Sequence, residues 1–293
     1  MQQGRILKGI GGFYYVLPED SSETVECKAR GRFRMDGLTP MVGDRVLFET
    51  QREGHARIAE LLPRKNALMR PPVANIDQLL IVLSASVPAP DWLLADKLIV
   101  QAKLLSIEPV LVLNKCDESG TAVLSAFERD YAAHFRCLRV SARRGDGLSA
   151  LTDLLRGRVS CFAGQSAVGK SSLINAICPE LSLETGGLSK KTARGRHTTR
   201  HAELWPAFGG AILDTPGFSL FEPDFLEQDA LDRCYPEFMD LPAQCRFFGC
   251  MHISEPDCAV KERIAAGGMS PARYERYTLL AREFETRRKH RYD

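Results

Sequence analysis

The sequence predicts an α/β protein of several domains: an N-terminal β-barrel, a central parallel sheet covered by helices, and a mainly helical, metal-binding C-terminal part. Three observations predict this architecture. Short β-prone runs separated by turn signals fill residues 4 to about 64. Continuous apolar strands then alternate with amphipathic helices, which is typical of a parallel sheet with both faces covered. Finally, cysteines gather around a histidine near the C-terminus.

The composition is that of a globular chain. Of 293 residues, 44% are hydrophobic and 26% are charged, and the formal net charge of +2 does not by itself indicate nucleic-acid binding. The N-terminus, "MQQGRILKG", lacks the apolar segment of a secretion signal, and the most apolar run, "IDQLLIVLSASV", is too short to span a bilayer. We therefore expect a cytoplasmic protein whose nine cysteines are reduced thiols.

The N-terminal barrel carries a basic run. Lys28, Arg30, Arg32 and Arg34 fall at every second position, so a strand through this run would place all four on one face. Such a face is either a solvated outer surface or a contact surface for a phosphate backbone. The following segment, "LPRKNALMRPPVANID", contains three prolines, and we expect it to be an irregular linker.

A phosphate-binding loop is indicated just past the middle of the chain. The segment "GQSAVGKS" fits the pattern G-x4-G-K-[ST], follows the buried strand pattern "RVSCFA" and precedes a helical one. Glycines let backbone N–H groups curl around phosphates, and the helix N-terminus adds positive potential. Lys170 would reach the β and γ phosphates, and Ser171 would coordinate Mg²⁺. The candidate nucleotide-binding residues here are Gly164, Gln165, Ser166, Ala167, Val168, Gly169, Lys170, Ser171 and Ser172.

A guanine-reading motif is indicated by "NKCD" at the end of the strand pattern "EPVLVLN". Asp117 can accept hydrogen bonds from N1–H and the 2-amino group of guanine, which adenine lacks. Asn114 would bridge loops, and the stem of Lys115 would lie against the base. The pair Ser141-Ala142 ends another strand pattern, and its backbone could contact the guanine O6.

Two further segments would contact the γ-phosphate. "DTPG" follows the strand pattern "GGAILD", so Asp214 would hold the Mg²⁺ shell through water and the N–H of Gly217 would bind the γ-phosphate. The polar, basic segment from Glu184 to His201 resembles a switch loop, in which Thr198 or Thr199 would complete the Mg²⁺ shell.

The hydrolytic group is less clear from the sequence. Phe218 occupies the place after "DTPG" where many GTPases carry a water-orienting glutamine, and a phenyl ring cannot orient water. We therefore expect slow hydrolysis by the isolated protein, with the missing group supplied by His197 or by a partner. The catalytic candidates are His197, Lys170, Thr198 and Thr199.

The order of these motifs is unusual, because the guanine motif precedes the phosphate loop. All of them fall at the carboxyl ends of expected strands, where ligands bind in open α/β sheets. A circular permutation gives this order without changing the sheet, since chain termini are often close together.

A zinc site is indicated by Cys245, Cys250, His252 and Cys258, which offer three thiolates and one imidazole. This is a complete tetrahedral set, so we expect a structural site whose metal stabilises the fold around it. Phe247 and Phe248 lie between the ligands, and we expect them to fill a small core rather than to stack on bases.

A helix is expected after Ser270-Pro271, with an apolar stripe for packing at Tyr274, Tyr277, Leu280 and Phe284. The basic end, "RRKHRYD", is either a solvated tail or a contact for RNA phosphates.

The permuted motifs, "HTT" in the switch segment, "DTPGF" and the Cys-Cys-His-Cys cluster together resemble the RsgA (YjeQ) family of ribosome small-subunit-dependent GTPases. The resemblance covers essentially the whole chain. It implies an OB-fold domain at 1–65, a circularly permuted P-loop GTPase domain at 66–221 and a zinc-binding domain at 222–293. It also implies a monomeric cytoplasmic enzyme without membrane contact. Its partners would be GTP, GDP, Mg²⁺, structural zinc, the 30S subunit and 16S rRNA, with a role in late maturation of that subunit.

Two other readings of the residues stay open. The first is a P-loop kinase or ATPase, which "NKCD" argues against because that motif demands guanine. The second is a zinc-containing RNA-binding module in which hydrolysis is vestigial. GTP turnover with and without small subunits would separate this module from a subunit-stimulated GTPase.

Overall fold

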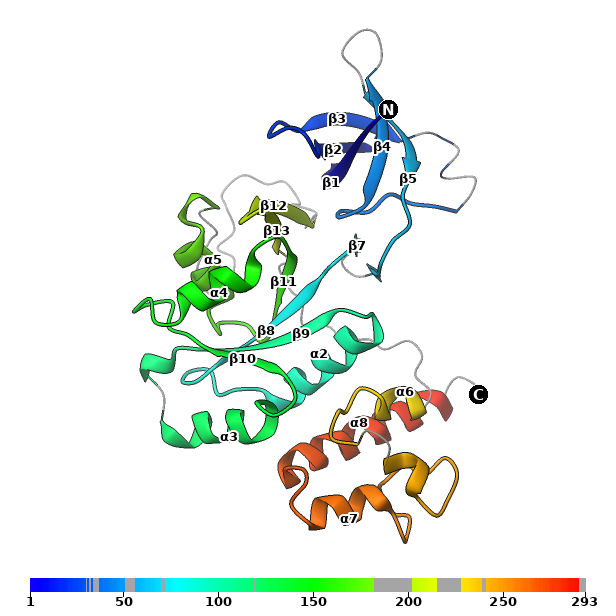
Figure 1. The fold of residues 1–293 in the computed structure, drawn as a ribbon, viewed down its shortest axis with the longest axis vertical. Helices are drawn as coiled ribbons and strands as arrows, with labels where there is room; N and C mark the ends of the chain where they lie inside the picture. Colours follow the sequence, from blue (N-terminus) through cyan, green and yellow to red (C-terminus); the bar gives the residue numbers. More distant parts are fainter. Residues whose placement is uncertain are drawn as a thin grey trace, which may run out of the picture.

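Five short strands at the N-terminus close into a barrel, at one end of an elongated chain (Figure 1). The structure is a computed structural model that describes residues 1–29, 31, 33, 37–50, 56–69, 72–118, 120–181, 202–214, 228–238 and 241–289. The central sheet lies in the middle of the long axis and a helical region at the other end (Figure 1). No described helix is long and apolar enough to cross a membrane.

The barrel is built from strands that pair in the order β1-β2-β3-β5-β4, with β4 returning to β1. Their bounds are β1 (Gln2–Ile10), β2 (Phe13–Pro18), β3 (Val25–Ala29), β4 (Arg45–Thr50) and β5 (Ala56–Leu61). The side chains that point inward are fully buried, among them Ile6, Val16, Val46, Phe48 and Ile58. Closure leaves no free sheet edge, as the sequence predicted for this region.

The strand prediction for the basic run is wrong beyond its first residues. β3 is described as far as Ala29 and includes Lys28, whereas Gly31 lies in a turn, so the described residues do not form one strand through the whole run. Lys28 Nζ lies 4.8 Å from the ring centroid of Phe13 on the neighbouring strand. Glycine favours a turn over a strand, which explains why Gly31 does not continue the strand with its alternating side chains. Arg30, Arg32 and Arg34 lie outside the described residues.

The central sheet has the order β10-β9-β8-β11-β13-β12, and the first five of these strands are parallel. The bounds are β8 (Gln78–Ser84), β9 (Glu108–Asn114), β10 (Arg136–Arg139), β11 (Val159–Ala163), β12 (Glu203–Ala207) and β13 (Gly210–Asp214). β12 runs antiparallel to β13 and also contacts β1, where Lys8 pairs with Glu203. Leu7 and Val42 also pack in the hydrophobic cluster of the sheet, so strand pairing and apolar packing both join the barrel to this edge.

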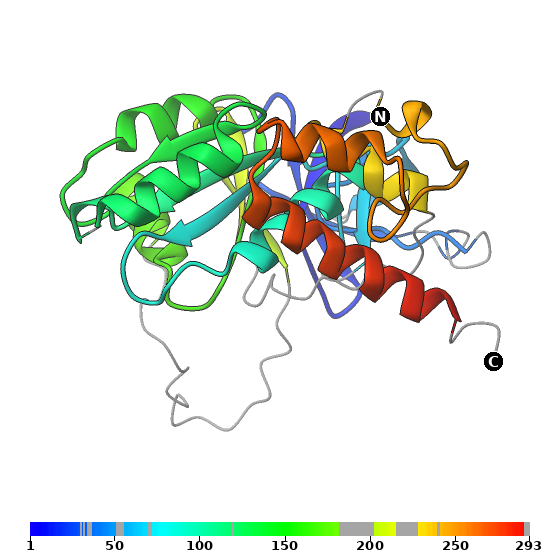
Figure 2. The ribbon, with the colours of Figure 1, turned by 90° about the horizontal axis from the view of Figure 1, so that it is seen from below.

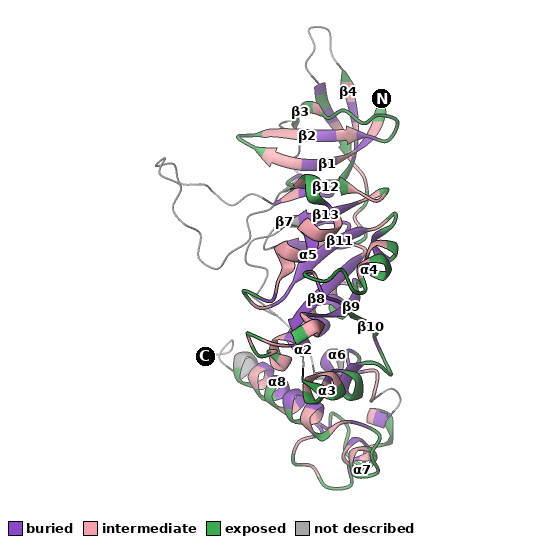
Figure 3. Cartoon of the chain, turned by 90° about the vertical axis from the view of Figure 1, so that its left-hand side faces the viewer, coloured by how far each residue is buried: buried purple, intermediate pink, exposed green. Residues whose placement is uncertain are grey.

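Helices cover both faces of the sheet. Helices α2 (Trp92–Leu104) and α3 (Thr121–Tyr131) lie on one face, and α4 (Leu148–Leu155) and α5 (Lys170–Ile177) lie on the other. Single 3₁₀ turns follow β9, as η1 (Cys116–Glu118), and α5, as η2 (Pro179–Leu181). Alternate residues of β8 supply the two cores: Leu79 and Ile81 pack with α2 and α3, while Leu80 and Val82 pack with α4 and α5. The central strands are therefore buried on both sides (Figure 3), which explains their continuous apolar sequences.

The expected linker is an ordered hairpin, so that expectation is wrong. It contains β6 (Ala67–Met69) and β7 (Pro72–Ala74). Asn66 exchanges two side-chain hydrogen bonds with the backbone of Ile76, at 2.8 and 2.9 Å. Asn75 donates to the carbonyl of Gly43 at 3.1 Å. These two buried amides therefore hold the two ends of the hairpin to each other and to the backbone of Gly43.

The C-terminal region is mainly helical and has its own core. It contains α6 (Gln228–Asp232), the 3₁₀ turn η3 (Leu241–Gln244), α7 (Ala259–Ala265) and α8 (Pro271–Lys289). The expected stripe on α8 is confirmed, because Tyr277, Leu280 and Phe284 are buried and Tyr274 packs against them. Cys250 and Cys258 belong to the same core, so the metal-ligand candidates are part of the packing.

Buried charges join this region to the central sheet. Helix α8 packs against α2 (Figure 2), and Arg273 and Arg276 both donate to the carboxylate of Asp96. Arg276 also donates to Asp130 at 3.0 Å, and the hydroxyl of Tyr131 donates to Asp96 at 2.9 Å. Burial alone would lower the pKa of both guanidinium groups, but the charge of Asp96 raises it, so they remain charged.

Candidate functional site

The phosphate loop connects β11 to α5 in a conformation that requires its glycines. Gly164 has φ +132°, and a Cβ there would lie 2.2 Å from the carbonyl oxygen of Val82. Gly169 has φ +96°, and a Cβ there would lie 2.4 Å from Nδ2 of Asn114. Lys170 Nζ donates to the carbonyls of Gly164 and Gln165, both at 2.8 Å. The loop therefore curls around the tip of its own lysine.

The guanine motif lies directly against this loop. Asn114 ends β9 and is 1% exposed. Its Nδ2 donates to the carbonyl of Val168 at 2.9 Å, and its Oδ1 accepts from the N–H of Ala142 at 3.2 Å. Lys115 Nζ donates to the carbonyls of Ala167, at 2.9 Å, and of Val87. The structure thus brings "NKCD", "SA" and the phosphate loop together, although they are far apart in the sequence.

A cavity of about 320 Å³ opens at this junction. Its lining consists of Asn114, Lys115, Asp117, Glu118, Ala142, Arg143, Gly169 and Ser172. Asp117 is in the 3₁₀ turn η1, and a hydrogen bond with the side chain of Ser141 lowers the pKa of its carboxyl, followed by the charges of Arg143 and Arg144. A carboxylate is therefore held ionised on the wall of a ligand-sized cavity.

The remaining expected site residues are only partly described. Ser171 and Ser172 lie in the first turn of α5, at the phosphate-loop end. Asp214 ends β13 one residue beyond Leu213, which pairs with Cys161 of β11, so its backbone lies at the same edge as the phosphate loop. Gly217, His197, Thr198 and Thr199 lie outside the described residues.

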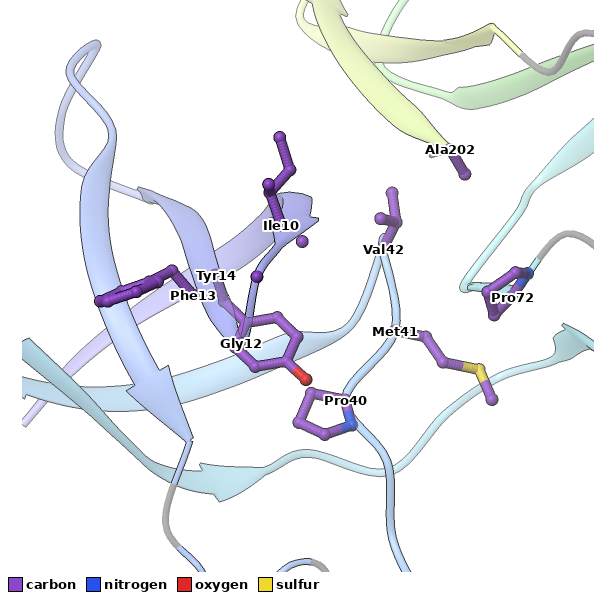
Figure 4. Close-up of a pocket in the computed structure, with 11 residues that line it drawn as sticks. Ile10, Gly12, Phe13, Tyr14, Pro40, Met41, Val42, Pro72 and Ala202 are labelled. Carbon is purple, nitrogen blue, oxygen red and sulfur yellow. The ribbon is translucent and has the colours of Figure 1, made fainter. Parts of the chain in front are cut away.

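A second cavity, of about 240 Å³, lies where the barrel meets the sheet (Figure 4). The turn after β1, with Gly11 and Gly12, forms one wall, and Pro40 and Met41 form another. Ala202, the first described residue after the expected switch segment, completes the lining at the start of β12. This cavity places Ala202 beside the barrel.

The four expected metal ligands come together in the C-terminal region. The ligand atoms of Cys245, Cys250, His252 and Cys258 all lie within 4.8 Å of one another. Nδ1 of His252 is 3.5 Å from the Cys245 sulfur and 3.3 Å from the Cys258 sulfur, and these two sulfurs are 3.9 Å apart. A tetrahedral Zn²⁺ bound at about 2.3 Å from sulfur separates its ligand atoms by roughly 3.5–3.8 Å. The donor set and its spacing fit such an ion.

Sequence reasoning missed the residues behind the histidine. His252 is fully buried, and its Nε2 faces Oδ2 of Asp232, in α6, at 3.4 Å. The hydroxyl of Tyr277 donates to Oδ1 of the same carboxylate at 2.7 Å. Metal-binding histidines commonly direct their second ring N–H at a carboxylate, and Nε2 and Oδ2 have this arrangement although their geometry is not that of a hydrogen bond. Asp232 precedes the first ligand by 13 positions and stands in no motif, so no signal in the sequence identified it.

The two phenylalanines between the ligands do not fill a core, so that expectation is wrong. Phe248 is fully exposed and Phe247 is 44% exposed. Gly249 has φ +72°, and the N–H of Cys250 donates to the carbonyl of Phe247 at 3.3 Å. This tight turn directs Cys250 inward and leaves the preceding aromatic side chains outside. The core of the region is filled instead by Tyr235, Phe238 and Tyr277.

Comparison with known proteins agrees with this geometry. The family model described as RsgA GTPase matches residues 61–224, and the model described as RsgA N-terminal domain matches residues 3–58. The protein named small ribosomal subunit biogenesis GTPase RsgA from Caldanaerobacter subterraneus subsp. tengcongensis is 45% identical over 99% of this chain and 98% of its own. The protein of the same name from Bacillus velezensis is 40% identical over 98% of this chain and 99% of its own.

Two solved structures share the whole fold. The crystal structure of YjeQ from Thermotoga maritima has a TM-score of 0.85 and 36% identity, and covers 97% of this chain and 98% of that one. The crystal structure of YloQ, described as a circularly permuted GTPase, has a TM-score of 0.83 and 34% identity, and covers 98% and 96%. The permuted sheet that the motif order predicted is therefore confirmed, and the chain belongs to the RsgA family of GTPases.

Proposed function

We propose that this chain binds and hydrolyses GTP during biogenesis of the small ribosomal subunit. In this proposal the 30S subunit stimulates hydrolysis, and the nucleotide state controls binding to the subunit and release from it. The names of the relatives support the role in biogenesis. The nucleotide assignment is supported by the contacts between the guanine motif and the phosphate loop.

One observation carries the nucleotide assignment. Asn114 and Lys115 are hydrogen-bonded to the carbonyls of Val168 and Ala167, so the base-reading residues and the phosphate loop share one cavity edge. In the proposed site Asp117 accepts from the guanine, Ser141 and Ala142 approach O6, and the phosphates lie over residues 164–172. Asp117 would reject adenine, because a site built for the 2-amino group leaves its carboxylate unpaired.

Hydrolysis is assigned to residues around the γ-phosphate. Lys170 neutralises the β and γ phosphates, and Ser171 with Thr198 or Thr199 binds Mg²⁺. Asp214 supports the metal through water, and the N–H of Gly217 binds the γ-phosphate. His197, or a group from the 30S subunit, orients the attacking water.

The remaining assignments follow from the family. The barrel, taken as residues 1–65, is an OB-fold that contacts 16S rRNA, the GTPase domain spans 66–221, and the zinc-binding domain spans 222–293. The Cys₃His cluster binds one structural Zn²⁺, which supplies four bonds that fix the loop between its ligands. The protein works as a monomer in the cytoplasm, where small subunits mature, and has no membrane partner.

The two ends of the chain are attached differently to the nucleotide-binding sheet, which supports a hinge. The barrel is joined to β12 through the pairing of Lys8 with Glu203, and β12 begins two residues after the end of the expected switch segment 184–201. The C-terminal region is held to α2 by buried ion pairs. A change in the switch segment would therefore move the barrel. The sheet and the zinc-binding domain would keep their positions relative to each other.

The test of the proposal is GTP turnover with and without purified 30S subunits. We expect slow turnover by the protein alone and a large increase with subunits. GTP and GDP should compete for binding while ATP does not.

Equal turnover with and without subunits would contradict the stimulation. Equal affinity of the protein for subunits in GDP and in a non-hydrolysable GTP analogue would contradict control by the nucleotide. An H197A protein with unchanged stimulated turnover would assign the hydrolytic group to the subunit.

A further inference from the structure

A turn that carries the two phenylalanines projects from the metal-ligand cluster. We call residues Arg246 to Gly249 the knuckle, because they connect Cys245 to Cys250. Both ligands are anchored in the cluster, and the backbone N–H of Arg246 donates to the carbonyl of Asp257 at 3.3 Å. The knuckle is therefore fixed at both ends although its own side chains are exposed.

Phe248 occupies the tip of the knuckle and leaves its ring open to solvent. The side chain is fully exposed, whereas Phe247 is half-covered, with the guanidinium of Arg246 5.4 Å from its ring centroid. A free phenyl ring in water forgoes the burial that drives folding, so stability of the isolated chain gives no reason for it. A rigid, open aromatic face does suit a flat partner that lies parallel to it.

The surroundings of this ring favour a nucleobase over a protein surface. Among the described residues of the C-terminal region, the exposed large apolar side chains are Phe247, Phe248 and Leu279, and Leu279 is on α8 rather than on the knuckle. One fully exposed ring beside a half-covered one is far smaller than the apolar centre of a protein interface. It is sufficient for stacking on a base, which metal-bound knuckles of RNA-binding proteins also use.

A cation beside the ring fits the same partner. Arg246 is exposed and forms an exposed ion pair with Asp257, at 2.6 Å. Such a pair is weak and can exchange for a phosphate oxygen. We propose that Phe248 stacks on an unpaired base of the RNA in the small ribosomal subunit, with Arg246 next to the backbone of that nucleotide. This inference rests on the proposed binding to that subunit.

The test measures the affinity of the metal-loaded full-length protein for purified small subunits, with a non-hydrolysable GTP analogue present. Three substitutions of Phe248 separate stacking from apolar packing. F248A removes the ring, F248L keeps an apolar side chain without a flat face, and F248W keeps and enlarges the flat face. Leu279→Ala is the matched control, because Leu279 is also an exposed apolar residue of this region, 52% exposed. The metal content of each variant is measured to show that the knuckle is intact.

We expect F248A and F248L to weaken binding by roughly 5- to 100-fold, as for loss of one stacked base. F248W and L279A should bind like the wild type. We also expect a difference in the slope of log affinity against log salt concentration. This slope should be unchanged in F248A and shallower in R246A, since only the arginine contacts phosphate. The tryptophan emission added by F248W should be quenched on binding.

Two results would overturn the inference while leaving the proposed function in place. Wild-type binding by F248A would mean that the ring has no partner. Normal binding by F248L with weak binding by F248A would mean that the ring enters an apolar pocket of a ribosomal protein. Failure of the wild-type protein to bind small subunits would instead refute the proposed function, and with it this inference.

Discussion

The candidate nucleotide site and the metal cluster are built in opposite ways. The nucleotide site combines residues that are far apart in the sequence, such as Asn114 and Gly169. A six-stranded sheet with a hydrophobic core on each face holds these residues in place. The metal cluster takes all its ligands from residues 245–258, and its surroundings consist of short helices and turns. The sheet holds the residues of the nucleotide site in place. At the metal cluster we expect the reverse, with the bound metal holding the short segments around it in place.

The difference predicts how each site responds to loss of its ligand. In the nucleotide site, Asn114, Lys115 and Lys170 hold main-chain carbonyls of the phosphate loop, so the geometry needs no nucleotide. In the metal cluster, three sulfurs and an imidazole nitrogen converge within 4.8 Å, and burial raises the pKa of the Cys250 and Cys258 thiols. Protonated thiols bind one another weakly, so we propose that a metal ion, bound to the deprotonated thiolates, stabilises this arrangement.

The largest expected effect is loss of the metal. Cys258→Ala removes one of four ligands from a buried position, and structural zinc sites contribute apparent folding free energies of about 10–16 kcal/mol. We expect a zinc content near zero and unfolding of the C-terminal region, while GDP binding persists because the sheet has its own cores. Zinc analysis, limited proteolysis and GDP titration measure the three outcomes.

Cys137→Ala is the control, since Cys137 is a half-buried cysteine on β10 outside the cluster. It should keep its zinc and its protease resistance. If C258A lost GDP binding together with its metal, the two sites would not be independent, and the comparison would fail.

A matched pair of glycine substitutions tests the nucleotide site. Gly169→Ala puts a Cβ 2.4 Å from Nδ2 of Asn114 and forces apart the guanine motif and the phosphate loop. We expect at least a hundredfold loss of GDP affinity, about 2.7 kcal/mol, with full zinc content. Isothermal titration calorimetry measures the affinity.

Gly157→Ala is the control for backbone strain. Gly157 also has positive φ, +68°, but nothing lies within 4 Å of the added Cβ. A similar loss of affinity in both variants would mean that the clash with Asn114 is irrelevant. It would also remove the argument that this contact assembles the site.

The same contrast explains how much the sequence could predict. The sheet, its helices and the phosphate loop were predictable, because continuous apolar strands and fixed spacings such as "GQSAVGKS" depend on local chemistry. The clustering of the four candidate metal ligands was predictable for the same reason. Their conformation was not: whether Phe247 and Phe248 point inward depends on the turn at Gly249, which is set by the cluster as a whole.

Contacts between distant segments account for the other failures. Strands β6 and β7 pair with each other, and the buried side chains of Asn66 and Asn75 bond the backbone beside them, whereas asparagine close to prolines ordinarily indicates a loop. Asp232 and Asp96 have partners 20 and 177 or more positions away, and a single sequence contains no signal for such pairing.

A smaller effect is expected behind the metal. Asp232→Asn keeps the size of the side chain but removes the negative charge that faces Nε2 of His252 at 3.4 Å. Loss of such a supporting carboxylate typically lowers metal affinity 10–100-fold. Competition with a chromophoric chelator measures this directly. Asp153→Asn, in an exposed pair with Arg156, is the control and should bind zinc normally. Equal zinc affinities of D232N and D153N would show that the charge of Asp232 does not support metal binding.

The smallest expected effect concerns the protonation of Asp117. A hydrogen bond with Ser141 is the main cause that lowers the pKa of the Asp117 carboxyl, so the group stays ionised to a lower pH than an ordinary aspartate. In the proposed site this carboxylate accepts hydrogen bonds from guanine, so we expect affinity to fall when the pH drops through its pKa. Ser141→Ala raises that pKa towards the ordinary value, and binding should then be lost at a higher pH. We expect little difference between the two proteins in GDP affinity at pH 8, and a several-fold weaker affinity of S141A only below about pH 3.5, under the ordinary aspartate pKa of about 3.9, measured by titration across this range. The zinc-dependent part of the fold does not contain this group, so a parallel pH series on C258A should show the wild-type profile. A profile in S141A that coincides with the wild type at every pH would mean that another group keeps Asp117 ionised.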